Sequence, residues 1–357
     1  MSDPSNTPPN ASSTATATVA ACVTDDLPPV RIDHLCYPHI LDLVLAYAPR
    51  PALLALRRTC RAYRDRADAL LAEHVVLDLV SDSSGYDYVR VKSADGGRLP
   101  CLAGQNVLFN DTRSANMLGR CAPVLKSTRV VDVRGRMTAD VLCPLSRAMP
   151  GTTVLRLDGG NDDAMASCPL RTPTVVVFSS LLPARRPRTL LPRLPTIPAH
   201  VRRLIVNVAY TNGDPTLPAS FIAPYGKADT LDDFVIVFTK LAMTSRVPKL
   251  WSCESSDTLG VLHHIIHAMG RHILVKKYTF VGLNELDPVC LGLPGAEPDE
   301  VRKQTVAAVD EQLRGLAQQF HLDDEGMEDV RPELCFLSRG EYCDLVGKGQ
   351  FAVDTAG

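Results

Sequence analysis

Short runs rich in valine, isoleucine and leucine recur along the chain and constrain its fold more than any other feature. Eight of them lie at residues 74–80, 129–135, 152–160, 174–180, 201–210, 233–240, 273–283 and 333–342. Several are continuously apolar and do not alternate with polar residues, a pattern typical of strands that are covered on both faces. We therefore expect eight β-strands, most of them in the interior of a sheet.

Two segments with helical patterns lie between the last three apolar runs. Residues 255–272 and 297–320 each repeat apolar side chains at helical spacing. Asp257 suits the N-cap of the first, and the second has Pro298 and acidic residues in its first turn. Alternating strands and helices favour parallel pairing. The sequence thus predicts an α/β fold with a mostly parallel sheet.

The spacing of the runs leaves two forms of this sheet open. The centres of five runs lie at Val131, Leu155, Val176, Ile205 and Ile236. They follow one another at roughly 21 to 31 residues, near the period of leucine-rich repeats. The recurrence is loose, because Asn161 falls one place late for the asparagine of such a repeat. A degenerate solenoid and an ordinary α/β sheet with variable crossovers both fit.

Length, charge and cysteine usage narrow the class of protein. A chain of 357 residues that is 45% apolar can build the core of one or two domains. Its net charge of −2 gives no general attraction to nucleic acid or to an anionic membrane. No window approaches the roughly 18 uncharged apolar residues that a membrane span needs. The eleven cysteines are scattered without a C-x-x-C pair, so we expect reduced thiols.

Residues 1–30 consist mainly of serine, threonine, alanine and proline. Such a segment buries too little apolar surface to offset the entropy of ordering it, so we expect a disordered tail. The same residues include no lysine or arginine, which argues against a secretory or transit peptide. Together with the reduced thiols, this indicates a cytoplasmic or nuclear protein.

Two helical patterns follow the tail. The first begins at Pro38, where a missing N–H costs nothing, and ends before Pro49. The second begins after Pro51, and its apolar positions advance in steps of three and four without a break. These positions are Leu53, Leu56, Cys60, Tyr63, Ala67, Leu70 and His74. We therefore expect one continuous second helix that reaches His74.

The stretch "HLCYPHILDLVLAYAPRPALLALRRTCRAYRDRA" resembles an F-box. Its second half follows the form L-x-x-L-R-R-x-C-R-x-[WY]-R from Leu53 to Arg64. The matching positions are Leu35, Ile40, Leu41, Val44, Leu45, Leu53, Leu56, Arg57, Cys60, Arg61, Tyr63 and Arg64. The resemblance gives an F-box-like helical motif at 31–75. Residues 76–357 loosely resemble the leucine-rich-repeat-like α/β interaction domains that are often joined to F-boxes.

This resemblance implies a non-catalytic substrate receptor of an SKP-cullin-F-box type ubiquitin ligase. The helices would bind an SKP-type adaptor, and through it a cullin, while the C-terminal domain would hold a target protein whose identity stays open. Neither a cofactor nor a metal is implied. The adaptor-binding residues would be Leu35, Ile40, Leu41, Val44, Leu45, Leu53, Leu54, Leu56, Cys60 and Tyr63.

Other functions stay open beside this one. The helices would only cap the fold in a structural or scaffold protein. The five arginines between Arg57 and Arg66 would suit nucleic acid, but Asp65, Asp68 and Glu73 interrupt or follow them, so a solvated helix surface explains them better. The proline- and arginine-rich segment 182–198 reads as a surface loop or a docking segment.

Enzyme chemistry has little support in the motifs. His263 and His267 have the i, i+4 spacing of zinc ligands, but Ile265 and its neighbours offer no catalytic glutamate. The sequence contains no phosphate loop, no G-x-S-x-G and no G-x-G-x-x-G. An α/β enzyme would need a pocket with converging polar groups, so we predict no catalytic residues.

Overall fold

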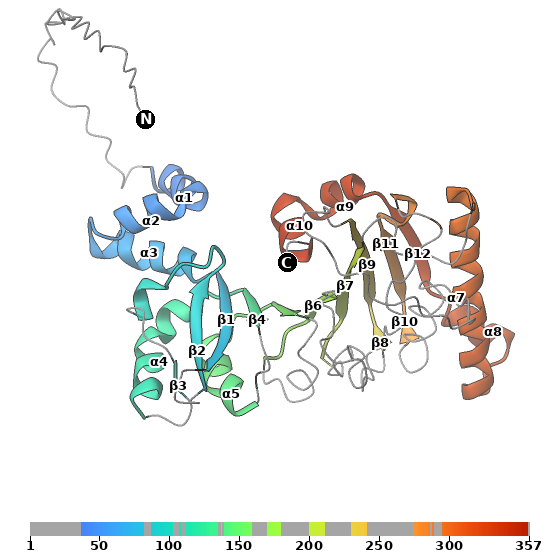
Figure 1. The fold of residues 1–357 in the computed structure, drawn as a ribbon, viewed down its shortest axis with the longest axis horizontal. Helices are drawn as coiled ribbons and strands as arrows, with labels where there is room; N and C mark the ends of the chain where they lie inside the picture. The colour runs from blue at the N-terminus through green and yellow to red at the C-terminus, as the bar shows by residue number, and fades with distance from the viewer. Residues whose placement is uncertain are drawn as a thin grey trace, which may run out of the picture. The chain divides into compact units, whose positions relative to one another are not determined.

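The chain divides into two compact units, Met1–Tyr47 and Ala48–Gly357 (Figure 1). The computed structural model describes residues 37–81, 87–102, 107–108, 112–134, 137, 139–158, 170–179, 200–210, 230–240, 274–285, 288 and 295–355. The expected tail at 1–30, helix at 255–272 and loop at 182–198 lie outside these residues. In the first unit the structure describes one helix, α1 (Pro38–Tyr47), which begins at the predicted proline.

The second unit opens with two short helices, α2 (Arg50–Leu56) and α3 (Arg61–Leu71). The prediction of one continuous helix to His74 is wrong here. The Thr59 hydroxyl donates to the Leu56 carbonyl at 2.7 Å, and Cys60 has an extended backbone as the N-cap of α3. Because the apolar spacing continues across this turn, periodicity alone did not reveal the break.

The main sheet of this unit has ten strands, in the order β12-β11-β9-β7-β6-β5-β4-β1-β2-β3. They are β1 (His74–Ser81), β2 (Asp87–Ser93), β3 (Val107–Leu108), β4 (Val130–Arg134), β5 (Val154–Asp158), β6 (Thr174–Ser179), β7 (Arg203–Tyr210), β9 (Asp233–Lys240), β11 (Lys277–Val281) and β12 (Glu333–Leu337). A separate pair joins β8 (Thr230–Leu231) to β10 (Leu274–Val275). All pairs of the main sheet are parallel except β1–β2 and β2–β3. The predicted α/β class with a mostly parallel sheet is confirmed.

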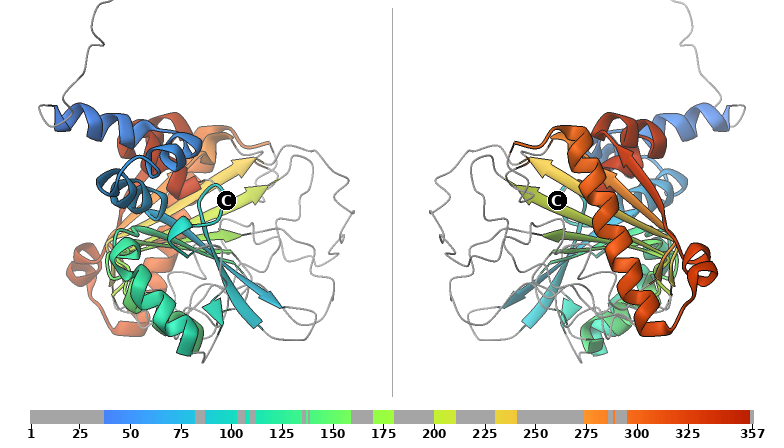
Figure 2. Two further views of the ribbon diagram at one scale, coloured as in Figure 1. Left: turned by 90° about the vertical axis from the view of Figure 1, so that its left-hand side faces the viewer. Right: turned by 90° about the vertical axis from the view of Figure 1, so that its right-hand side faces the viewer.

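Strand order is simple on one side of β1. From β4 to β12 each strand of the main sheet lies next to the preceding one, while β2 and β3 extend the sheet on the other side of β1. Successive strands are rotated relative to one another, as the right-handed twist of strands requires (Figure 2). The order of the main sheet therefore changes direction once, between β1 and β4.

One face of the main sheet is apolar along its length. Its two cross-strand rows are Val75, Val131, Leu155, Val175, Leu204, Phe234 and Tyr278, and Leu77, Val133, Leu157, Val177, Val206, Ile236 and Phe280, all of them buried. Helix α7 (Pro298–Phe320) packs on this face. The guanidinium carbon of its Arg302 lies 5.0 Å from the centre of the Phe336 ring, and Phe336 is the register partner of Phe280. This helix confirms the prediction at 297–320.

Further helices connect the strands of the sheet. They are α4 (Thr112–Leu125), α5 (Ala139–Ala148) and α8 (Asp324–Asp329), with short 3-10 turns at Pro100–Leu102 and Leu283–Glu285. Right-handed crossovers place α5 on the same face as α7, since both connect strands that advance in the same direction. Leu142 and Leu145 of α5 are fully buried, and α5 contacts α4.

The opposite face changes character along the sheet. Over β6 to β11 an apolar cluster on this face, with the polar Arg203 and Asn207 beside it, packs against α9 (Arg339–Val346) and α10 (Lys348–Thr355). Tyr342 of α9 is buried there among Val176, Ile205 and Val235. Over β4 and β5 the same face carries the charged Asp132 and Arg156 beside Val130 and Val154, which belong to the apolar cluster.

Buried polar contacts hold α9 and α10 to the sheet. The Tyr342 hydroxyl donates to Asp354 Oδ2 at 2.7 Å and accepts from Arg203 Nη2 at 2.9 Å. Asn207 Nδ2 donates to the Asp354 carbonyl at 2.6 Å. Asp354 has no exposed surface, so its carboxylate depends on the Tyr342 hydroxyl and on Gln350 Nε2, which donates to Oδ1 at 2.6 Å.

The predicted strand at 333–342 ends earlier than expected, at Leu337. Ser338 Oγ accepts from the Glu341 N–H, and Glu341 Oε2 accepts from the Ser338 N–H at 2.7 Å. This capping box starts α9 and ends the strand. The bonds from Ser338 also lower the pKa of Glu341, which keeps it ionised in this role.

We predict that Tyr342→Phe lowers the free energy of unfolding by about 1–3 kcal/mol, because the buried Asp354 carboxylate loses a donor. Urea denaturation followed by circular dichroism measures the change. Tyr88→Phe is the matched control, since that half-buried hydroxyl accepts only from Arg90 in the contacts we describe. Equal losses in the two variants would show that the contact with Asp354 contributes nothing special.

Candidate functional site

Helix α1 and Tyr37, the residue before it, expose five large apolar side chains. Their exposed fractions are 49% for Tyr37, 50% for Ile40, 57% for Leu43, 54% for Val44 and 84% for Tyr47. At about 100° per residue these positions share one side of the helix. We call them the α1 apolar stripe. Such a group of exposed apolar side chains indicates an interaction surface.

The sequence-predicted adaptor-binding residues do not form one exposed surface. Leu45 is buried and Leu41 half-buried in the first unit, where Ile40 and Val44 are exposed. In the second unit Leu53 is buried at 7% exposure, while Cys60 is exposed. The half-buried members there are Leu54, Leu56 and Tyr63. Leu35 lies outside the described residues.

Ion pairs fix α2 and α3 within the second unit. Arg50 donates to Ser93 Oγ at the end of β2 and, at 2.9 Å, to Asp95 Oδ1 in the turn that follows. Arg57 donates from Nε and Nη2 to the two oxygens of Asp68 at 2.9 and 3.2 Å. Asp68 is buried, so Arg57 is a structural partner and not part of the solvated arginine surface that we expected. Arg61, at 93% exposure, does fit that expectation.

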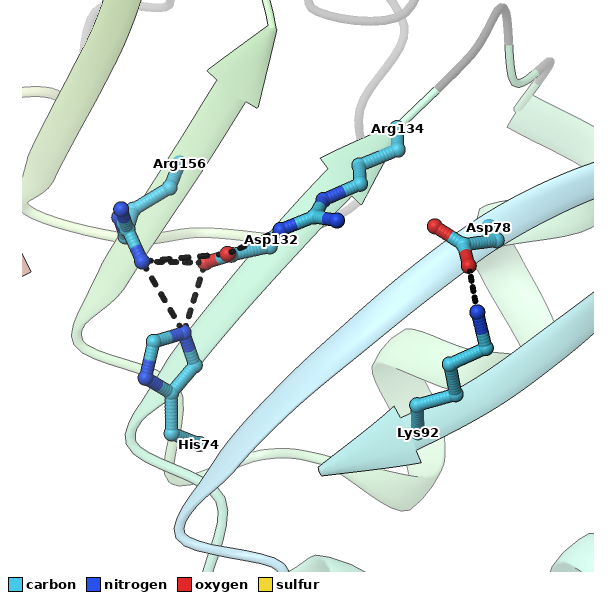
Figure 3. Close-up of polar contacts among 6 residues, drawn as sticks. All are labelled: His74, Asp78, Lys92, Asp132, Arg134 and Arg156. Carbon is cyan, nitrogen blue, oxygen red and sulfur yellow. Dashed lines mark hydrogen bonds and ion pairs between the residues drawn. The ribbon is translucent and has the colours of Figure 1, made fainter. Parts of the chain in front are cut away.

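A second cluster lies on the main sheet, where β1, β4 and β5 meet (Figure 3). Arg156 Nη1 lies 3.0 and 3.1 Å from the two oxygens of Asp132, and His74 Nε2 lies 2.8 Å from Asp132 Oδ1. Asp132 and Arg156 are buried and His74 is half-buried. The strands place them together because Asp132 and Arg156 are register partners, and His74 starts the strand on the other side of β4.

More charged side chains surround this cluster. Arg134 Nη2 lies 3.9 Å from Asp132 Oδ2, and the Arg134 side chain is 54% exposed. On the neighbouring strands Lys92 donates to Asp78, and Arg90 Nη2 donates to the Tyr88 hydroxyl at 3.2 Å. Cations therefore outnumber carboxylates among the described side chains of this region.

The environment of Arg156 is unusual for a charged group. Burial lowers the pKa of Arg156, and the neighbouring Asp132 carboxylate opposes that shift. Its guanidinium carbon lies 4.8 Å from the centre of the Phe178 ring, within the range of a cation–π contact. Its Nε is buried and has no hydrogen-bond partner. Since arginine stays protonated in proteins, a buried positive charge is left with unused donor capacity.

The sequence predicted the α1 apolar stripe only in part and did not predict the charged cluster. The predicted contacts of α1 followed the side that carries Leu41 and Leu45, so Tyr37, Leu43 and Tyr47 were not among them. Asp132 and Arg156 did carry a signal, since each interrupts a valine- and leucine-rich run at its centre. A charge within a strand that is covered on both faces requires a partner.

Metal and membrane roles find no support in the described part of the chain. No group of three His, Cys, Asp or Glu side chains there is placed to hold a metal ion. His263 and His267 lie outside it. None of the helices described combines the length and the apolar character needed to cross a bilayer. The six described cysteines are free thiols, and Cys121 is the buried one among them.

We predict that Asp132→Ala lowers the free energy of unfolding by about 3–5 kcal/mol, because it leaves the Arg156 charge buried without its partner. The double variant Asp132→Val/Arg156→Leu should lie much closer to the wild type, since it buries no charge. Guanidinium denaturation of the three proteins tests this. A single variant as stable as the wild type would contradict the assigned ion pair.

Comparison with known proteins gives no relative: no protein-family model, no curated protein and no solved structure matches this chain. Its function must therefore be argued from its own residues. The exposed stripe on α1 and the charged cluster at β1, β4 and β5 are the two features that carry that argument.

Proposed function

We propose that this chain is a non-catalytic receptor of F-box type. Its α1 apolar stripe binds an SKP-type adaptor and through it a cullin, and its α/β domain holds a target protein for ubiquitination. The exposure of Ile40, Leu43, Val44 and Tyr47 on one side of a short helix supports this most directly. These residues lie within the stretch that resembles an F-box.

The energetics of the stripe favour a docking role. Burying an exposed valine, leucine or isoleucine side chain is worth about 1.5–3 kcal/mol, so docking the stripe into an apolar groove of a protein would contribute free energy to binding. An amphipathic helix laid into an apolar groove is a common form of recognition. In this arrangement α1 supplies the anchors, while Leu53 of α2 is buried and serves the fold.

The remainder of the chain supports target capture in a weaker way. Strands β4 to β12 follow one another in sequence order in the main sheet, as strands do in a solenoid. We therefore regard the domain as leucine-rich-repeat-like. Its work is proximity: a target held beside a ubiquitin-conjugating enzyme reacts at a raised effective concentration. This function would place the chain in the cytoplasm or the nucleus.

A structural or scaffold role is the second candidate. Arg50 ties α2 to the turn after β2, and Arg57 ties it to α3. These contacts suit helices that cap the α/β domain. In that case α1 would need no adaptor, and the exposed stripe would have no partner of this class.

We predict that Val44→Asp abolishes co-purification with an SKP-type adaptor, or weakens it by more than about tenfold, because a charge in an apolar groove is left without solvation. Ala46→Asp is the control. Ala46 is exposed on the opposite side of α1, so replacing it by aspartate introduces the same charge away from Val44. Leu53→Asp is a poor test, since a charge at that buried position would destabilise the fold.

Two results would contradict the receptor function. One is that the wild-type chain does not associate with an SKP-type adaptor at micromolar concentration. The other is that Val44→Asp and Ala46→Asp bind the adaptor equally well. Circular dichroism of all three proteins confirms that they are folded before binding is compared.

A further inference from the structure

The charged cluster of His74, Asp132 and Arg156 belongs to a larger surface. The cross-strand pairing of β1, β2, β4 and β5 shows which residues share that surface. Lys92 and Asp132 both pair with Val76, and Arg90 and Arg134 both pair with Asp78. Residues that pair directly across strands lie on the same face of a sheet. We call this surface the basic face, and its members are His74, Asp78, Tyr88, Arg90, Lys92, Asp132, Arg134 and Arg156.

Positive charge dominates the basic face. Arg90, Lys92, Arg134 and Arg156 outnumber Asp78 and Asp132 by two. Asp158 holds a register position on the same face of β5, and counting it still leaves an excess of one cation before any protonation of His74. The chain as a whole has a net charge of −2, so this excess is local.

Stability does not explain why this part of the sheet is charged. A buried ion pair contributes little more to stability than apolar residues of similar size, and often less. Over β7 the polar side chains of the same face, Arg203 and Asn207, bond to α9 and α10, which cover them. The partners described for Asp132 and Arg156 lie instead on the sheet itself. The charges therefore point to a use beyond folding.

Arg156 shows incomplete bonding on this face. A single nitrogen, Nη1, serves both oxygens of Asp132, whereas arginine commonly meets a carboxylate with two nitrogens in parallel. Its buried Nε has no partner. Orphaned buried donors are rare, and each calls for an explanation such as an ordered water or ion. The neighbouring Arg134 is more than half exposed and 3.9 Å from Asp132, so its guanidinium is accessible to a ligand of this face.

We propose that the basic face binds an acidic, extended peptide segment of a partner protein, with its carboxylates on Arg90 and Arg134. The interspersed Asp78 and Asp132 favour a peptide over nucleic acid. They would repel a continuous phosphate backbone, whereas a peptide also offers N–H donors to carboxylates. The site is built from residues of the second unit only and does not depend on adaptor binding.

The test is the binding of a fluorescein-labelled octapeptide of alternating glutamate and serine to the full chain, measured by anisotropy. Arg90→Gln/Arg134→Gln should weaken binding by about tenfold or more, as expected for the loss of two contacting cations. Arg120→Gln/Arg202→Gln is the matched control. It removes two exposed cations outside the basic face and should change affinity less than about twofold.

Three outcomes would overturn the proposal. The wild-type chain does not bind the peptide at sub-millimolar concentration; the two double variants weaken binding equally; or a single-stranded oligonucleotide of equal charge binds more tightly than the peptide. If Arg90→Gln/Arg134→Gln does not fold, Arg134→Gln alone serves, because that side chain is mostly exposed. Adaptor binding should be unchanged in these variants, which separates this test from that of the proposed function.

Discussion

Parallel pairing between strands that are buried on both faces is the constraint on which the second unit depends. Slipping β4 by one residue would exchange Val131 for Asp132 on the apolar face, and slipping β5 would exchange Leu155 for Arg156. Either slip would put a charge among buried leucines and valines. Register is therefore fixed strongly, and every cross-strand contact of the sheet follows from it. The charged cluster is one product of this register, since neither Asp132 nor Arg156 would find its partner in any other alignment.

The two candidate surfaces differ in how they arise. The α1 apolar stripe is a local feature: it follows from helical geometry and from residues of one ten-residue helix and the tyrosine before it. The basic face is a non-local feature, because its members come from four strands spread between His74 and Arg156. A surface of the first kind suits a short docking element, while one of the second kind needs the whole sheet to be folded before it exists.

Much of the fold could be predicted from sequence, and the parts that could not have physical reasons. The eight apolar runs and the helix at 297–320 were readable, because burial on both faces and helical periodicity leave clear patterns. Helices α4 and α5 were missed, since Pro123 and Pro144 lie inside them and proline argues against a helix interior. The site was only half readable: Ile40 and Val44 followed from local spacing, but the pairing of Asp132 with Arg156 depends on register between distant segments.

The position of α10 in the chain has a consequence for biosynthesis. Asp354, Phe351 and Tyr342 complete the cover over β6, β7 and β9, yet the ribosome makes those strands more than a hundred residues earlier. During translation the central strands must wait with one apolar face uncovered. A nascent chain at that stage presents bare valine-rich strands, the state in which chaperones commonly bind newly made proteins.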